Sequence, residues 1–274
     1  SLGDCLAWFP YVEEFRKKHQ CNVTCATNWA SLFKDTYPDM KFCGLEWSGN
    51  FYAIYMIGCY PDTARSLFTY KDVTLQRISS SILGINHKEI KPVLKVNDTE
   101  RKIKEKYVCF ATHSTAQAKF WNNPTGWLEM CNHLNALGLK PVLIQAEPRD
   151  DLPNIINRSG PKDIQETMNL IHHSEFFVGI GSGLSWLAWA LNKPTVLVSG
   201  FSLPRSEFYT PYRVINTNVC NGCWNEYDFD KGDWMWCPRQ RGTAREFECS
   251  KQISGLMVID AINELINTEG IRLS

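Results

Sequence analysis

Hydrophobic residues along this chain follow two alternating patterns. Short uninterrupted apolar runs are typical of strands buried on both faces of a parallel sheet, whereas apolar residues repeating every three to four positions indicate helices. Their alternation predicts β-α-β units and an α/β fold. The expected strands are 22–26, 52–59, 106–111, 140–145, 176–178 and 195–198. The expected helices are 5–18, 28–34, 63–83, 125–137, 163–173, 184–191 and 253–266.

A polar stretch that contains Pro92 divides these elements into two series. We therefore expect two Rossmann-like domains facing a cleft, residues 1–90 and 106–215, joined by a linker at 91–105. Residues 1–4 resemble the turn that follows a strand, so the first strand and any preceding domain are expected to be missing. An insert rich in Asn, Asp, Trp and Cys follows at 216–250, and 251–274 predicts a closing helix.

Composition narrows the class of protein. The 29 basic and 29 acidic residues give a net charge of zero, which argues against a nucleic-acid partner bound through bulk charge. No apolar run is long enough to predict a membrane span. Most of the 11 cysteines stand singly within apolar runs, where they act as small hydrophobic residues, and unpaired buried thiols favour a reducing compartment. We expect a cytoplasmic protein.

The segment 176–198 carries the most informative motif. A short strand is followed by Gly179, Gly181 and Gly183, which permit a tight turn and a close backbone approach, and then by an apolar helix. The free N–H groups and the dipole at the start of such a helix suit an anion such as a diphosphate. A plain β-α-β packing unit without a ligand would show the same pattern.

Two further loops carry candidate reactive groups. Asp4 follows a glycine just before a predicted helix, where a carboxylate suits a general base, although a helix-capping aspartate would occupy the same position. After the strand at 106–111, the hydroxyls of Ser114 and Thr115 and the ammonium of Lys119 suit phosphate binding. A lysine in a solvated loop is the alternative for Lys119.

Four cysteines fall together in the insert. Cys220 and Cys223 have the spacing of a metal knuckle, and Gly222 between them allows a turn that points both thiolates at one ion. Cys237 and Cys249 would complete a tetrahedral site for zinc or iron. Such a site would brace a segment that has little core of its own. Unligated thiols or a disulfide are the alternatives.

Several of these pieces occur in the same order in a known family. They are residues 1–4, Thr115 with Lys119 and Trp121, and Ser182 to Ser185 followed by Ala190, Leu191 and Pro194. Together with the segment 6–15 and the cysteine insert, they resemble the bacterial autotransporter heptosyltransferases. These are ADP-heptose-dependent protein O-heptosyltransferases related to the lipopolysaccharide heptosyltransferases. The resemblance covers nearly the whole chain and implies the GT-B arrangement.

The resemblance implies an inverting transfer of heptose from ADP-heptose to serine hydroxyls of an adhesin passenger domain, with Asp4 as the general base and no catalytic metal. Lys119 would hold the diphosphate with Ser114 and Thr115. Backbone donors would come from Ser182, Gly183, Leu184 and Ser185. The family further implies one structural iron per chain, rather than zinc, and a large ring of subunits. The implied iron ligands are Cys220, Cys223, Cys237 and Cys249.

The chain departs from the lipopolysaccharide enzymes at two positions. Gly181 stands where they usually carry an Asp, and Trp186 stands where they carry a His. A lipopolysaccharide core heptosyltransferase is the related alternative, and the cysteine quartet disfavours it. A metal-braced binding module without turnover is the alternative from a different class.

Overall fold

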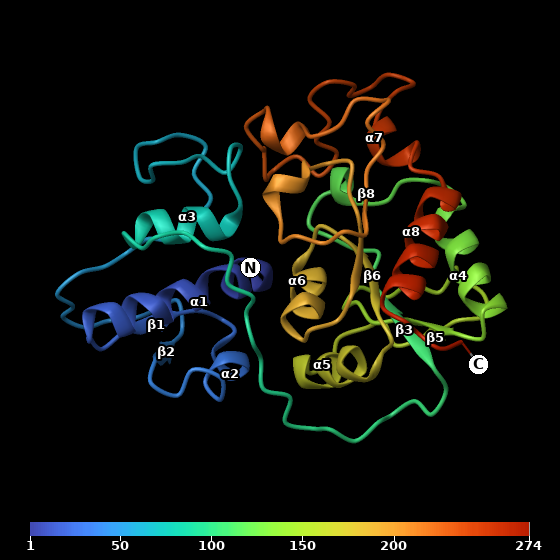
Figure 1. Cartoon of the computed structure of the whole chain (residues 1–274). Coiled ribbons are helices and arrows are strands. Elements are labelled where there is room, and N and C mark those ends of the chain that lie inside the picture. Colours follow the sequence, from blue (N-terminus) through green and yellow to red (C-terminus); the bar gives the residue numbers. More distant parts are fainter. Residues whose placement is uncertain (274) are drawn as a thin grey trace.

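A sheet of six parallel strands forms the centre of the C-terminal lobe in the computed structural model, which describes residues 1–273 (Figure 1). The strands are β3 (Tyr107–Phe110), β4 (Lys140–Leu143), β5 (Ile156–Asn157), β6 (Phe177–Ile180), β7 (Thr195–Val198) and β8 (Arg213–Val214). They lie in the order β5-β4-β3-β6-β7-β8, and the register places Cys109 beside Phe177. Because β3, β6 and β7 are buried along their whole length, they appear in the sequence as uninterrupted apolar runs.

Helices cover both faces of this sheet, α5 and α6 on one side and α4 and α8 on the other (Figure 1). They are α4 (Gly126–Ala136), α5 (Ile164–His173), α6 (Gly183–Ala190) and α8 (Gly255–Thr268). The four predicted helices of this lobe are confirmed, and their ends carry the expected signals. Asp163 caps α5, and Gly138 takes a left-handed φ of 76° after α4. In the predicted closing segment 251–274, Ser274 lies outside the described residues.

The N-terminal lobe is smaller and has a two-stranded parallel sheet. Its elements are α1 (Leu2–His19), β1 (Thr24–Ala26), α2 (Ala30–Phe33), β2 (Lys41–Cys43) and α3 (Leu75–Ile82). Helix α1 packs on α3 within this lobe and on α6 of the other lobe (Figure 1). One apolar core therefore continues from Leu6 and Phe9 of α1 to Leu187 of α6. The predicted α/β class with parallel sheets is confirmed.

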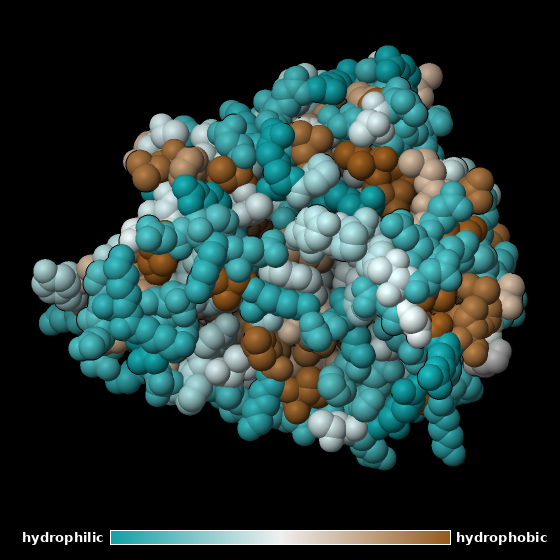
Figure 2. All heavy atoms as spheres, in the orientation of Figure 1, coloured by the Kyte–Doolittle hydropathy of each residue, from teal (hydrophilic) through white to brown (hydrophobic). Residues whose placement is uncertain are grey.

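The strand predicted at 52–59 is wrong. Tyr52 is fully exposed, Ile54 and Met56 are more than half exposed, and no strand of the described residues pairs with this segment. Figure 2 shows apolar side chains at the surface of this part of the molecule. An apolar run becomes a strand only where a neighbouring strand satisfies its backbone groups, and none is present here.

The helix predicted over 63–83 is limited to α3. Before it, Asp62, Ser66 and Thr69 each accept a hydrogen bond from the backbone N–H two residues further on, at 3.0, 3.3 and 3.2 Å. These local turns compete with helical hydrogen bonds. Thr74 then caps α3 by accepting a backbone N–H at 3.0 Å, which fixes where the helix begins.

The segment predicted as a linker, 91–105, has neither helix nor strand and runs between the two lobes (Figure 1). The insert at 216–250 also consists mainly of turns. The remaining short elements are η1 (Gln117–Lys119), η2 (Pro204–Ser206), η3 (Cys223–Asn225) and α7 (Glu248–Lys251). Within residues 1–273, no helix combines the length and the apolar character that crossing a bilayer requires.

Candidate active site

The candidate site lies where the order of the strands reverses. From β3 the chain moves outward to β4 and β5, and it then returns to place β6 on the other side of β3. The loops after β3 and β6 leave in opposite directions, and the crevice between them is where open parallel sheets bind ligands. Lys119 follows β3 and residues 181–183 follow β6, so the topology brings two motifs that are distant in sequence to one place.

A cavity of about 110 Å³ occupies this crevice, and the first turn of α1 contributes to its wall. Four of the predicted site residues line it: Asp4, Lys119, Ser182 and Gly183. The structure therefore brings together the carboxylate, the cation and the start of the glycine-loop helix. Other lining residues are Gly181, Trp186, Phe201, Glu207 and Trp224.

Helix α6 begins at the wall of this cavity. Within residues 1–273, no acceptor is present for the backbone N–H groups of Ser182, Gly183 and Leu184. The Ser182 hydroxyl is buried and likewise has no hydrogen-bond partner in the described part of the chain. These free donors, together with the positive end of the helix dipole, suit an anionic group of a ligand.

The Lys119 ammonium is held among aromatic rings at the end of η1. Its Nζ lies 5.6 Å from the ring centroid of Phe201 and 5.9 Å from that of Trp224. Burial lowers the pKa of Lys119, whereas the carboxylates of Glu207 and Asp4 act in the opposite direction. A cation that is partly stripped of water and lines a cavity attracts an anion more strongly than one in solvent.

Asp4 lies in the first turn of α1, which begins at Leu2, so residues 1–4 are not the turn that we predicted. Ser1 and Asp4 form a capping box, in which the Ser1 hydroxyl accepts the backbone N–H of Asp4 at 3.4 Å and Oδ2 of Asp4 accepts from the Ser1 amino group at 3.0 Å. The Ser1 hydroxyl also donates to Oδ2 at 2.7 Å. Among the described residues Oδ1 makes no hydrogen bond, and the side chain remains 26% exposed. Capping therefore occupies one oxygen and leaves the other available to accept a proton.

The remaining predicted residues lie outside the wall of the cavity. Ser114 is buried and Thr115 is exposed, and neither lines the cavity. The Ser185 hydroxyl donates to the carbonyl of Ile180 at 2.6 Å, and its N–H bonds to the carbonyl of Ser182 at 3.2 Å. Both donors of Ser185 are thus engaged within the protein, and Leu184 offers only its backbone N–H.

Glu207 is a charged residue of this wall that the sequence pattern does not single out. It follows η2, and its carboxylate forms an ion pair with Arg213 at 2.9 Å. The one signal in the sequence is an acidic residue directly before Phe208, which is buried. Because acidic side chains are seldom covered by protein without a partner, one beside a buried residue is a sign of a polar partner or a ligand.

The four cysteines of the insert are free thiols. Burial raises the pKa of Cys249 to about 12, with smaller contributions in the same direction from Cys220, Cys223 and Cys237. The four thiols therefore lie within electrostatic reach of one another. Within residues 1–273, however, no three His, Cys, Asp or Glu side chains are arranged to hold a metal ion, so the predicted metal-binding insert is not shown. The backbone N–H of Cys220 donates to the Glu248 carboxylate at 3.3 Å, which fixes the main chain here and leaves the thiol out of that bond.

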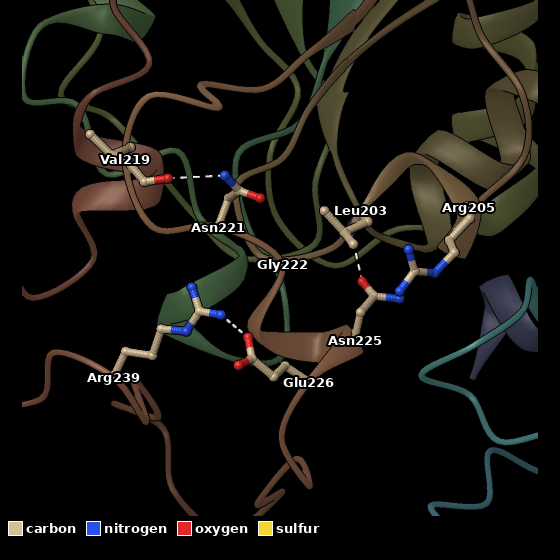
Figure 3. A pocket seen from close by; sticks show the side chains of 8 residues that line it. All are labelled: Leu203, Arg205, Val219, Asn221, Gly222, Asn225, Glu226 and Arg239. Carbon is tan, nitrogen blue, oxygen red and sulfur yellow. Dashed lines mark hydrogen bonds and ion pairs between the residues drawn. The ribbon is translucent and has the colours of Figure 1, made fainter.

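A second and larger cavity of about 380 Å³ lies beside the insert (Figure 3). Its lining includes Arg205, Asn225 and the ion pair between Arg239 and Glu226, and it contains none of the predicted binding residues. We assign the site to the smaller cavity because only that one combines a cation, free amides and a carboxylate at the switch point of the sheet.

The chain belongs to glycosyltransferase family 9 (heptosyltransferase), whose model matches residues 65–237. It is thus a glycosyltransferase. Among its relatives, the autotransporter heptosyltransferase Aah of Escherichia coli is 43% identical over 97% of this chain and 72% of the relative. The inactive autotransporter heptosyltransferase BimC of Burkholderia thailandensis is 34% identical over 92% of this chain and 64% of its own length.

A solved structure extends this likeness to three dimensions. The dodecameric iron-containing heptosyltransferase TibC in complex with ADP-D-β-D-heptose superimposes with a TM-score of 0.92 at 40% identity, covering 97% of this chain and 74% of TibC. The resemblance to autotransporter heptosyltransferases that we inferred from the motifs is confirmed.

Proposed function

We propose that this chain transfers heptose from ADP-heptose to serine hydroxyls of an autotransporter adhesin. The main support for the proposal is that Lys119, Asp4 and the start of α6 line one cavity. The first amides of α6 have no acceptor among the described residues. A cation and free amides suit a diphosphate, and a carboxylate beside them suits the acceptor hydroxyl. The likeness to TibC, which binds ADP-D-β-D-heptose, supports this choice of donor.

In the proposed reaction the serine oxygen attacks C1 of the heptose while the bond from C1 to the diphosphate oxygen breaks. Asp4 takes the serine proton, and the bonding electron pair leaves with ADP. Lys119 and the amides of Ser182 and Gly183 stabilise the new charge, each well-placed donor by on the order of a few kcal/mol. Attack on the face opposite the diphosphate inverts the anomeric carbon.

The size of the cavity bears on how the donor binds. A volume of about 110 Å³ is well below the roughly 300–1,000 Å³ of pockets that enclose a whole small-molecule ligand. ADP-heptose is much larger, so it must extend out of the crevice, or the lobes must move apart around α1. The wall residues named above would then hold only the diphosphate and the sugar carbon next to it.

Incubation with labelled ADP-heptose tests the proposal. We expect label in an adhesin passenger domain and none in lipopolysaccharide core. Label found only in the lipid would establish the related alternative. Binding of ADP-heptose with no label in either acceptor would support a binding module without turnover, an outcome that the inactive relative BimC makes important to examine.

We further propose that Cys220, Cys223, Cys237 and Cys249 hold one structural iron, with zinc as the alternative. Four thiols in a segment with little regular structure are a suitable donor set for either metal. The mutual effect on their pKa values and the shared cluster of Cys223 and Cys237 support their proximity. Bound metal would brace the insert rather than take part in the transfer.

Elemental analysis tests this second proposal. We expect about one iron per chain, and we expect Cys223→Ser with Cys237→Ser to remove it. Cys131→Ser is the matched control, because Cys131 is equally buried but lies in the core between the sheet and α8. Equal metal content in the control and the double variant would contradict the assignment, and zinc in place of iron would correct the choice of metal.

The remaining expectations are proposals of the same kind. They are a GT-B arrangement with domains at 1–90 and 106–215, a linker at 91–105, an insert at 216–250, a closing helix at 251–274, a cytoplasmic location and a large ring of subunits. The dodecameric state of TibC supports the ring. Sedimentation of the purified protein would test it.

A further inference from the structure

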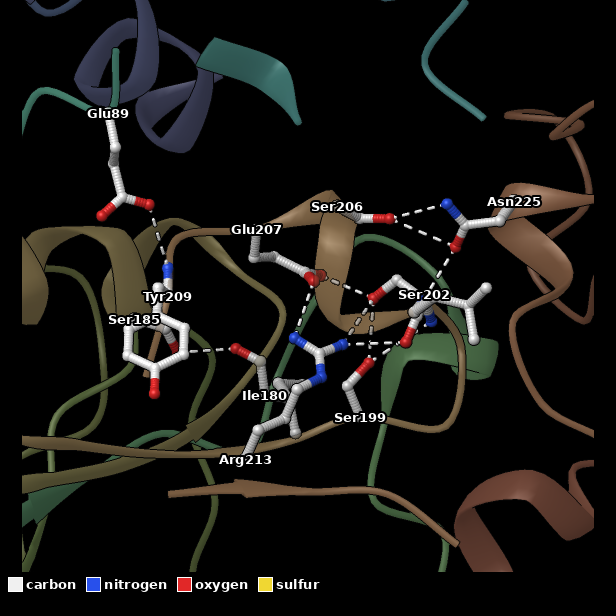
Figure 4. A network of polar contacts seen from close by, with 11 residues as sticks. Glu89, Ile180, Ser185, Ser199, Ser202, Ser206, Glu207, Tyr209, Arg213 and Asn225 are labelled. Atoms are coloured by element: carbon white, nitrogen blue, oxygen red, sulfur yellow. Dashed lines mark hydrogen bonds and ion pairs between the residues drawn. The ribbon is translucent and has the colours of Figure 1, made fainter. Parts of the chain in front are cut away.

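Glu207 is a largely covered carboxylate that lines the cavity and that the proposed mechanism does not use. Figure 4 shows its polar contacts. Its side chain is 11% exposed, and both of its oxygens have partners. Oε2 accepts a hydrogen bond from Arg213 at 2.9 Å, and Oε1 accepts one from the Ser202 hydroxyl at 2.6 Å. Arg213 also donates to the Ser202 carbonyl at 2.8 Å, so the three residues hold one another in place.

This carboxylate reaches the glycine loop itself. A Cβ atom on Gly181 would lie 2.8 Å from Oε1 of Glu207, which is closer than real Cβ contacts allow. The backbone of Gly181 is not in the left-handed region, so another residue could adopt its conformation. A side chain at 181 would therefore have to displace the carboxylate of Glu207, which fills this space.

A negative group beside a diphosphate site requires a physical reason, because it repels the phosphates. Arg213 offsets the charge of Glu207 within the network. A carboxylate has about four acceptor positions, and the network uses two. The remaining positions suit neutral hydroxyl donors rather than phosphate oxygens. In a nucleotide sugar, the hydroxyl-rich group nearest to the reacting carbon, and hence to Asp4, is the transferred sugar.

We propose that Glu207 recognises the sugar of the donor by accepting hydrogen bonds from its hydroxyls and thereby turns the anomeric carbon toward Asp4. This inference rests on the proposed function, since it requires a nucleotide sugar in this cavity. It makes Glu207 a specificity residue that distinguishes ADP-heptose from ADP.

Calorimetry with ADP and with ADP-heptose tests the inference on the whole chain. In Glu207→Ala we expect the affinity for ADP-heptose to fall by about 10- to 100-fold, the loss typical of a hydrogen bond to a charged group. The affinity for ADP should not fall, because the substitution removes a negative charge beside the diphosphate site. Glu89→Ala is the matched control, because Glu89 is exposed, lies outside the cavity and only accepts the N–H of Tyr209 at 3.3 Å (Figure 4). It should change neither affinity.

Two further variants keep the test decisive if Glu207→Ala does not fold. Glu207→Gln retains an acceptor for Arg213, and it should still weaken ADP-heptose selectively. Glu207→Ala combined with Gly181→Asp moves a carboxylate onto the loop, into the space that Glu207 vacates. We expect this pair to recover selective binding of ADP-heptose, whereas Gly181→Asp alone should weaken both nucleotides through a clash with Glu207.

The outcomes distinguish a failure of the inference about Glu207 from a failure of the proposed function. Equal loss of ADP and ADP-heptose affinity in Glu207→Gln would show that Glu207 only braces the loop, and unchanged affinities would show that it is irrelevant. Either result overturns the inference and leaves the proposed function standing. An unmodified chain that binds neither nucleotide would overturn both.

Discussion

The two walls of the cavity differ in how the fold supports them. Lys119 and residues 181–183 follow neighbouring strands in the middle of a six-stranded sheet that is covered by helices on both faces. Asp4 comes from a lobe whose sheet has two strands and in which residues 44–74 form neither helix nor strand. The wall that suits the diphosphate has its own scaffold, whereas the position of the carboxylate depends on where α1 lies.

The place of α1 is set by its contact with α6. A Cβ on Gly3 would lie 3.1 Å from Cδ1 of Trp186, and one on Gly183 would lie 3.2 Å from Cβ of Leu2. The two helix starts therefore meet almost backbone to backbone. It follows that substitutions in α1 should change the rate of transfer, and that substitutions in the sheet loops should change affinity for the nucleotide.

The largest effect is expected from Asp4→Asn. Removing a general base slows a reaction by about 10²- to 10⁴-fold, and asparagine keeps the size of the side chain and an oxygen that can pair with Ser1. Turnover should fall by this factor while ADP affinity, measured by calorimetry, stays the same. Transfer at the original rate would remove Asp4 as the base.

Gly3→Leu should have the next largest effect. The added side chain pushes α1 away from α6 and displaces Asp4, and a shift on the order of 1 Å can reduce turnover by about 10²-fold. Gly44→Leu is the matched control, since a Cβ there meets nothing within 4 Å. If both variants have the same turnover, the α1–α6 contact does not position the carboxylate.

Lys119→Ala should act on affinity. Loss of a charged donor to a diphosphate weakens binding of ADP and of ADP-heptose alike, by about 10- to 100-fold. The comparable loss for both nucleotides distinguishes Lys119 from Glu207. Titrations that match those of the unmodified chain would exclude contact between Lys119 and the phosphates.

The smallest effect concerns pH. Burial lowers the pKa of Lys119 in the free chain, and a bound diphosphate favours the charged form and raises that pKa again. ADP binding should therefore take up protons under alkaline conditions, and ADP affinity should decline as pH rises above the lowered pKa. Calorimetry at about pH 9 in two buffers of different ionisation enthalpy measures the uptake. Lys119→Met should abolish it, and identical heats for the unmodified chain in both buffers would refute the coupling.

The sequence predicted the C-terminal lobe and the approximate place of the site because both depend on local patterns. Runs buried on both faces and glycines before a helix are visible in a short window, and β-α-β topology then brings the strand ends together. Lys119, Ser182 and Gly183 line the cavity for this reason, whereas Asp4 reaches it from α1 of the other lobe. The turn at Gly222, whose φ is 69°, could be predicted in the same way.

The errors arise where structure depends on distant partners. The apolar run at 52–59 lacks a neighbouring strand, and side-chain bonds of Asp62, Ser66 and Thr69 to nearby backbone shorten the helix predicted before α3. Glu207 was missed, because its one signal in the sequence, an acid directly before Phe208, does not say what it faces, and its place in the wall depends on the missing side chain at Gly181.

The equal numbers of basic and acidic residues bear on how the donor reaches the crevice. The chain has 29 basic and 29 acidic residues, and the field of a helix end decays within its first turn. At physiological ionic strength, exposed charges are screened beyond about 8 Å. We therefore expect little long-range steering of an anionic nucleotide, so its association rate should vary little with salt. Discrimination among nucleotides must then depend on their different rates of dissociation from the crevice.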